Sequence, residues 1–189
     1  VMEWDLDAEG ATRNFSMRSS VVTVVNRTYA DVEAELAGGD PGESVALCAR
    51  LSGLLRGRRV AAGAAIIERS EPEVVLTGPA DDPQVELAPQ KEHPAAQLLV
   101  SELMILANSS AAAFAAVHGF PLLFRTQDAV LSKELAGIWS RPEDIHHVVK
   151  HLPPTSLELA PRPHAAIGAK AYATVTSPLR RYVDLVNLA

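Results

Sequence analysis

This chain of 189 residues contains little of what several protein classes require. It has one cysteine, Cys48, so a disulfide framework is excluded and a reducing compartment is expected. Aromatic residues make up only 5%, which favours alanine-rich helices over a β-sandwich. The 11 glycines and 13 prolines exclude collagen. Disorder is excluded because 48% of the residues are hydrophobic and the net charge is only −6.

No apolar run is free of polar residues for the length of a membrane span. The longest stretch, 98–117, contains Glu102 and Asn108, and a charge near the bilayer centre costs about 2.5–3.5 kcal/mol. We therefore predict a buried helix and no membrane partner. The opening residues also lack the segments of an export signal, and we expect a cytoplasmic protein. The pI of about 5.5 argues against a general nucleic-acid coat, but it leaves room for a local basic channel.

Helical and alternating patterns predict an α+β fold dominated by helices, with two β-hairpins. Thr28 is suited to cap the first helix, and Gly119 to end the longest one. The predicted hairpins pair 1–7 with 12–25 and 73–77 with 84–87, and the predicted helices span 29–36, 43–65, 94–118, 128–139, 141–151 and a last helix from 178. Because the sequence starts within a predicted strand and stops within a predicted helix, we expect a piece of a longer polypeptide.

The segment 176–182, with the sequence TSPLRRY, carries the most information. Ser177 and Pro178 are typical of the first positions of a helix, which would place Arg180 and Arg181 in its first turn. Cations there oppose the helix dipole unless an anion such as phosphate is bound. The alternative is that the arginines face water, or that Arg180 pairs with Asp184 at a spacing of i,i+4.

Two stretches resemble the ribonuclease II/R (RNB) family of exoribonucleases. Residues 172–184 resemble the signature near the end of the RNB catalytic domain, and 101–108, with the sequence SELMILAN, resemble a second typical stretch. Weaker similarities lie at 27–29, 124–125 and 163–168, in the same order and with similar spacing. The resemblance implies that 1–189 is the C-terminal part of such a catalytic domain.

The resemblance also implies an activity. Members hydrolyse single-stranded RNA processively from the 3′ end and release nucleoside 5′-monophosphates, with Mg²⁺ held by aspartates in the N-terminal half of the domain. The family's cluster of closely spaced aspartates is absent, since the pairs Asp5/Asp7 and Asp81/Asp82 lie at predicted hairpin turns and are expected to be solvated. We therefore expect this chain to be inactive alone and the Mg²⁺ ligands to lie outside it. Two alternatives stay open: a non-catalytic RNA-binding or scaffold relative, and a helix-rich protein-interaction module.

Residue roles follow from the matching positions. The resemblance implies that Arg180 grips the scissile phosphate in the transition state and that Arg181 contacts the RNA backbone. Ser177 would cap the helix that presents them. Tyr29 and Glu102 would hold the terminal nucleotides and sense the ribose 2′-hydroxyl. Taken without the resemblance, a helix-surface position is the better interpretation of Glu102, with a partly buried carboxylate as the alternative. Asn108 is expected to be a structural hydrogen-bonding residue.

Three further groups have less specific patterns. His147 and His151 stand at i,i+4, as metal ligands can, but no third ligand is apparent and a solvated helix face is the better interpretation. His164 could line an RNA path or fix its loop. The run of Arg56, Arg58 and Arg59 could extend a phosphate track or be solvated at the end of a helix.

Overall fold

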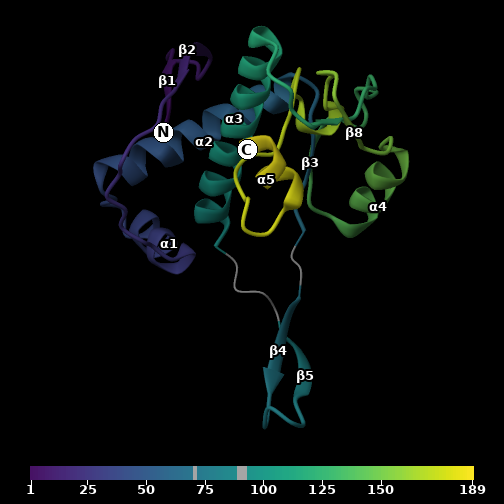
Figure 1. Cartoon of the computed structure of the whole chain (residues 1–189). Coiled ribbons are helices and arrows are strands. Elements are labelled where there is room, and N and C mark those ends of the chain that lie inside the picture. Colours follow the sequence, from purple (N-terminus) through teal and green to yellow (C-terminus); the bar gives the residue numbers. More distant parts are fainter. Residues whose placement is uncertain (70–71, 89–92) are drawn as a thin grey trace.

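A computed structural model describes residues 1–69, 72–88 and 93–189. In these residues, helices and four small sheets alternate along the chain (Figure 1). The strands are β1 Met2–Leu6, β2 Thr12–Met17, β3 Ala65–Ile67, β4 Glu73–Thr77, β5 Gln84–Ala88, β6 Phe124–Thr126, β7 Gly137–Trp139 and β8 Ser156–Glu158. The helices are α1 Tyr29–Ala37, α2 Glu43–Ala61, α3 Pro94–His118, α4 Pro142–His151, the short 3₁₀ turn η1 Ala165–Ile167 and α5 Tyr182–Leu188. The predicted α+β class is confirmed.

The long helix α3 is the centre of the arrangement. It packs against α1 and α2, and it buries a face that includes Glu102, Asn108 and Ala112. As predicted, it ends at Gly119, whose left-handed φ of 71° suits a residue without a side chain. By length and composition α3 is also able to cross a membrane, but here it holds two buried polar side chains against protein groups.

Small alanines allow the elements around α3 to approach closely. One core cluster joins α3 to β6 and to the residues just before the 176–182 segment, called the C-terminal motif below. It contains Ala112, Ala115, Phe124 and Ala173. A second cluster lies beneath β3, β7 and α4, and it contains Ala65, Leu135 and Val148. The C-terminal motif is therefore anchored on the main core through Phe124 and Ala173.

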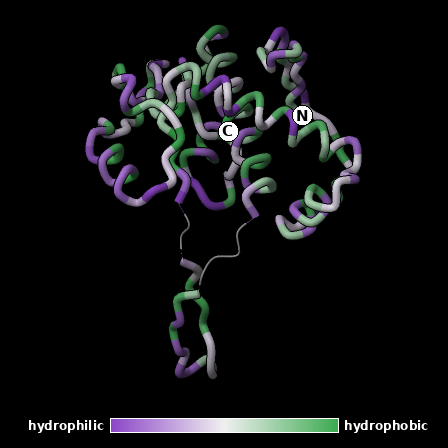
Figure 2. Tube along the Cα trace, turned by 180° about the vertical axis from the view of Figure 1, so that it is seen from behind, coloured by the Kyte–Doolittle hydropathy of each residue, from purple (hydrophilic) through white to green (hydrophobic). Residues whose placement is uncertain are grey.

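Each sheet has two strands. β1–β2, β4–β5 and β6–β8 are antiparallel, and β3–β7 is parallel. The β4–β5 hairpin matches its prediction, and it extends away from the other elements in both views (Figures 1 and 2). Val75 and Val85 lie on opposite faces of the hairpin, because Val75 pairs with Glu86 and Val85 with Leu76. Val85 is exposed.

Three local predictions are wrong. The strand predicted over 12–25 ends at Met17, because 20–25 has no partner strand among the described residues and its valines are exposed. The helix predicted to reach residue 65 ends at Ala61, and Gly63 then turns the chain with a φ of 89°. The helix predicted over 128–139 is absent, because Gly137–Trp139 pairs in parallel with β3.

Candidate RNA-binding and catalytic site

The segment 172–176 is extended and almost fully buried. The side chain of Asn108 on α3 forms hydrogen bonds to this segment at two positions. Its amide nitrogen donates to the Tyr172 hydroxyl at 3.0 Å, and its amide oxygen accepts from the N–H of Val175 at 2.9 Å. Buried polar groups are stable only when bonded in this way. Asn108 therefore fixes the position of the motif, in agreement with its predicted structural role.

The helix predicted to open at Ser177 and Pro178 instead begins at Tyr182, with Arg181 as its extended N-cap residue. The carbonyl of Ser177 accepts the N–H groups of Arg180 and Arg181, at 3.2 and 3.0 Å, and this closes one turn before the helix. Neither Arg180 nor Arg181 lies in a helical first turn, and Ser177 caps no helix. The anion-binding argument from a helix dipole therefore does not apply here.

Asp184, and not a Ser177 cap, forms the hydrogen bonds that hold this turn. Its side chain is fully buried, and one carboxylate oxygen accepts from the Ser177 N–H at 2.8 Å and from the Arg181 guanidinium at 2.8 Å. Burial by itself would raise the pKa of Asp184, but hydrogen bonds from Thr174, Ser177 and Arg181 hold that pKa below its ordinary value. The carboxylate therefore stays charged and closes the turn over 177–181.

Asn187 attaches α5 to the core one helical turn later. Its side chain accepts from the Leu123 N–H at 2.8 Å and donates to the carbonyls of Leu123 and Thr174 at 3.1 and 3.0 Å. Together with Asp184, it fixes the short helix at both ends. The turn over 177–181 thus rests on a rigid polar framework.

Arg180 projects from this turn into solvent. The side chain is exposed, and it makes no ion pair with a carboxylate among the described residues. Its neighbours Leu179 and Tyr182 are also exposed, the tyrosine at 79%. The alternative predicted from the sequence, an ion pair between Arg180 and Asp184, is wrong, because Arg181 forms the ion pair with Asp184. A free guanidinium on a fixed turn is suited to bind an external phosphate.

A cavity of about 440 Å³ lies beside the turn. It is lined by Arg125 of β6, hydroxyl residues before and within β8, and Thr174, Arg181, Tyr182 and Val183. None of the lining residues is acidic. Arg181 reaches the cavity with its charge already paired to Asp184.

Glu102, the other predicted substrate-binding residue on α3, is only 2% exposed. Arg59 of α2 holds it with two hydrogen bonds, at 2.9 and 2.5 Å, and donates a third to the Ile167 carbonyl at 3.1 Å. Next to this group, a side chain on Gly168 would come within 3.1 Å of the Arg59 carbonyl and of Ala64. Arg59 thus connects α2, α3 and η1.

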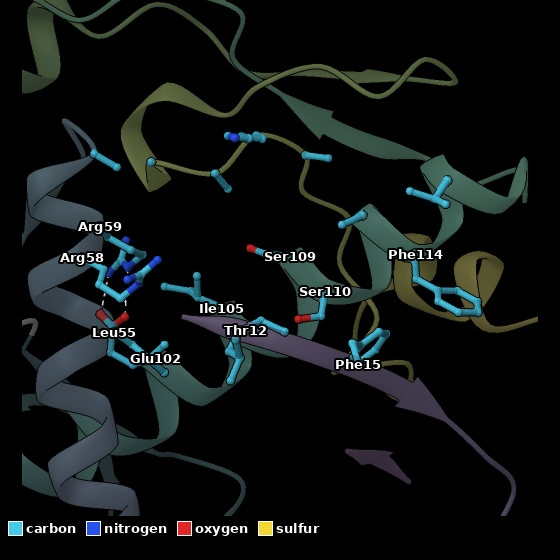
Figure 3. A pocket seen from close by; sticks show the side chains of 18 of the residues that line it. Thr12, Phe15, Leu55, Arg58, Arg59, Glu102, Ile105, Ser109, Ser110 and Phe114 are labelled. Atoms are coloured by element: carbon cyan, nitrogen blue, oxygen red, sulfur yellow. Dashed lines mark hydrogen bonds and ion pairs between the residues drawn. The ribbon is translucent and has the colours of Figure 1, made fainter. Parts of the chain in front are cut away.

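The Arg59–Glu102 pair forms one end of the largest described cavity, of about 720 Å³ (Figure 3). Phe15 and Phe114 lie at the other end in that view, and Arg58 and Lys170 also line the cavity. The lining is therefore mostly apolar with three basic side chains, and its one carboxylate, Glu102, is paired with Arg59.

The three arginines predicted as a possible phosphate track have separate partners. Arg56 pairs with Glu68, Arg59 with Glu102, and Arg58 donates to the Glu9 carbonyl at 3.5 Å. They form no continuous row of free cations.

Tyr29 lies apart from Glu102 in the described cavities. It is the first residue of α1, after a capping box formed by Thr28 and Asp31, and it is 47% exposed. It lines a cavity of about 430 Å³ between α1, α2 and α3, together with Arg27 and Cys48. The structure thus leaves the Tyr29 ring accessible, whereas Glu102 is covered.

No group of three or more His, Cys, Asp or Glu side chains able to hold a metal ion occurs within 1–69, 72–88 and 93–189. His147 and His151 come close, with ring centroids 4.5 Å apart, but His151 is bonded to the His147 carbonyl. In the described part of the chain, these two histidines therefore do not form a metal centre.

His164 is 4% exposed and packs edge-on against Tyr172, with ring centroids 5.7 Å apart. Neither ring nitrogen has a hydrogen-bond partner among the described residues. Its backbone holds the loop over 164–169, because the His164 carbonyl accepts from Gly168 and its N–H donates to Ala169. Burial, aided by the nearby charge of Arg125, lowers the pKa of His164 to about 4.

Because His164 is buried, we expect the unfolding free energy to fall in acid. Above pH 6.5 it is neutral in both states, and between pH 6.5 and about 4 the unfolded chain binds the proton first. We expect this residue to cost about 2 kcal/mol of unfolding free energy over that interval, after allowance for solvent screening. Urea unfolding at several pH values measures this cost. The variant His164→Phe should lose less stability than wild type, and parallel losses in both would contradict the prediction.

Comparison with known proteins identifies the chain. The model of the RNB domain matches residues 1–189. This chain belongs to the RNB domain family. The resemblance noted in the sequence is thereby confirmed. The match covers every element described above, so the exposed Arg180 and the buried Glu102 lie within an RNB domain.

Among its relatives, an uncharacterised ribonuclease of Synechocystis is 33% identical over 96% of this chain and 28% of its own length. The mitochondrial exoribonuclease II of Saccharomyces cerevisiae is 29% identical over 92% of this chain and 20% of its own length. This chain thus spans less than a third of the length of these relatives.

Solved structures show the same fold. Dss1 exoribonuclease of Candida glabrata, an active-site mutant, superposes with a TM-score of 0.72 at 28% identity, over 86% of this chain and 24% of its own. Mycoplasma genitalium RNase R in complex with double-stranded RNA superposes with a TM-score of 0.78 at 20% identity, over 98% of this chain and 40% of its own. The helix-dominated architecture is therefore that of the RNB domain.

Sequence reasoning missed two partners in this RNB domain. Asp184 stands three residues after Arg181, a spacing that allows an ion pair, but the turn before α5 decides which arginine it meets. Arg59 was considered only as part of a basic run. Its partner lies 43 residues away on another helix, and no local signal connects the two.

Proposed function

We propose that this RNB domain is part of a hydrolytic, processive 3′-to-5′ exoribonuclease that acts on single-stranded RNA and releases nucleoside 5′-monophosphates. Membership of the RNB family and the exoribonuclease names of two relatives support the reaction class. The observation that carries the proposal is Arg180, an exposed guanidinium on a turn fixed by buried hydrogen bonds.

In this proposal Arg180 grips the scissile phosphate. Its planar fork matches two phosphate oxygens, and its charge offsets the negative charge that develops on them in the transition state. The bonds from Asp184 and Asn187 keep the turn in place, so little reorganisation is needed when RNA binds. Tyr29 would stack on a terminal base, since its ring is accessible beside a cavity.

Two other predicted roles need adjustment. Ser177 contributes its backbone to the turn, through its carbonyl and its N–H, and does not act as a helix cap. Glu102 could accept from a ribose 2′-hydroxyl only after a local movement, because it is buried and bonded to Arg59. We keep Glu102 as the proposed ribose sensor, with Arg59 as its support.

Mg²⁺ remains part of the proposal for the complete enzyme. When bound, it would activate water and stabilise the leaving oxygen. The described residues bring no suitable ligands together, so we place the ligands in polypeptide outside this chain and derive no step through the metal. The single Cys48 fits a reducing compartment, and we propose a cytoplasmic location.

The experiment that tests this function uses RNA labelled at the 5′ end, with the polypeptide that contains this domain. With Mg²⁺ we expect direct conversion of the labelled strand to a short end product without accumulated intermediates, release of nucleoside 5′-monophosphates, and resistance of a DNA strand of the same sequence. The 189-residue chain alone should not cleave RNA. Tight RNA binding without any shortening would instead favour a non-catalytic RNA-binding relative.

A further inference from the structure

The cavity beside the C-terminal turn contains two arginines in unlike states. Arg181 is partly exposed, and its guanidinium donates to Asp184 at 2.8 Å and to the Thr176 hydroxyl at 3.3 Å. Arg125 is exposed on β6, and its side chain makes no hydrogen bond or ion pair within the described part of the chain. One guanidinium is therefore committed to a protein carboxylate, and the other is free.

The ion pair between Arg181 and Asp184 is costly to break. Asp184 is fully buried and charged, and a buried carboxylate left without its cation is strongly destabilised. A phosphate that drew Arg181 away would leave Asp184 with fewer donors and would loosen the turn from Ser177 to Arg181. Arg181 is thus better suited to hold the turn than to bind RNA.

Arg125 has the opposite environment. Its backbone is fixed, because its N–H donates to the Tyr172 carbonyl at 2.8 Å and β6 pairs with β8. Its side chain lines the cavity together with the hydroxyl residues Thr155 and Ser156, and no acidic residue lines that cavity. Tyr182, which is 79% exposed, completes the wall. A free guanidinium, nearby hydroxyls and an exposed aromatic ring are groups that bind a nucleotide phosphate and its base.

We infer that these arginines divide two tasks: Arg125 binds a backbone phosphate of the RNA, and Arg181, through Asp184, positions the turn that presents Arg180. This inference rests on the proposed function and deepens it. It assigns Arg125 as an RNA-binding residue, and it changes the role that the sequence predicted for Arg181 from RNA contact to positioning.

The test is the salt dependence of RNA binding. Each phosphate contact on single-stranded RNA contributes about 0.7 to the slope of log K against log salt. Anisotropy of a fluorescent single-stranded RNA, measured in EDTA from about 50 to about 200 mM KCl, gives this slope for the polypeptide containing the domain. We expect Arg125→Gln to reduce the slope by about 0.7 and to weaken binding about five-fold at 0.1 M salt.

Arg181→Gln should leave the slope unchanged and lower kcat about 10- to 100-fold with little change in KM, because the turn is misplaced. Arg141→Gln is the matched control, since it removes one exposed positive charge that does not line the cavity; it should change neither quantity. Should Arg181→Gln fail to fold, the pair Arg181→Met with Asp184→Leu removes the buried carboxylate together with its cation, and its slope should equal that of wild type.

The possible outcomes are separable. A slope reduced by Arg181→Gln or by the double variant overturns the inference, and so does a slope unaffected by Arg125→Gln. A wild-type polypeptide that binds no RNA refutes the proposed function itself. One that binds and degrades RNA while both arginine variants keep the full slope refutes only the division of tasks.

Discussion

Replacing Arg180 with alanine should lower the turnover of single-stranded RNA by about 10²–10³-fold, the usual effect of removing one donor to a developing charge. The guanidinium is free and its turn is held by Asp184 and Asn187, so the change removes a phosphate ligand without disturbing the core. RNA affinity should fall much less, because the interaction is strongest in the transition state. Single-turnover kinetics and equilibrium binding on the same RNA measure the two effects.

Arg180→Lys provides the control for charge. Lysine keeps the positive charge but lacks the planar fork, so it should recover only part of the lost turnover. Equal losses of turnover and affinity in Arg180→Ala would contradict a transition-state role and would reduce Arg180 to a binding residue. An unchanged turnover would remove it from the active site.

The second large effect concerns stability. Arg59→Ala should lower the unfolding free energy by about 3–5 kcal/mol, because it leaves the carboxylate of Glu102 buried without its cation. Glu102 is 2% exposed, and Arg59 supplies two of its hydrogen bonds and also binds the Ile167 carbonyl. Urea unfolding at neutral pH gives the difference. The connection between α2, α3 and η1 is expected to weaken with it.

Arg58→Ala is the matched control on the same helix. Arg58 is exposed, and its side chain reaches only the Glu9 carbonyl at 3.5 Å, so its loss should cost less than about 1 kcal/mol. The double variant Arg59→Met with Glu102→Leu should be more stable than Arg59→Ala, since it leaves no buried charge. Similar stability of Arg59→Ala and Arg58→Ala would show that Glu102 is not held as the structure indicates.

Elements governed by local signals could be predicted from the sequence. The capping box at Thr28 starts α1, Pro94 starts α3, and Gly119 ends it. These signals act within one turn of the chain, where backbone geometry and capping bonds decide the outcome. The strands β4 and β5 could also be predicted, because the alternating apolar and polar residues and the turn between them lie within a short stretch of the chain.

Elements that depend on a distant partner could not be predicted. Gly137–Trp139 has a helical pattern on both sides, but it pairs with β3, which lies some seventy residues earlier in the chain. The valines of 20–25 have high strand propensity and yet form no strand in the described structure. Propensity is a weak guide where the hydrogen-bonding partner comes from elsewhere.

By itself, the sequence determined the family and the helix-dominated α+β class, because motif order and hydrophobic periodicity are local properties. The role of Arg180 at a phosphate stays a prediction from the resemblance. Only the tertiary structure decided which arginine is free. Asp184 of α5 pairs with Arg181, Arg59 of α2 pairs with Glu102 of α3, and Arg125 has no carboxylate partner among the described residues. Charge pairing depends on distances in space, and spacing along the chain fixes those distances only within a helix or a turn.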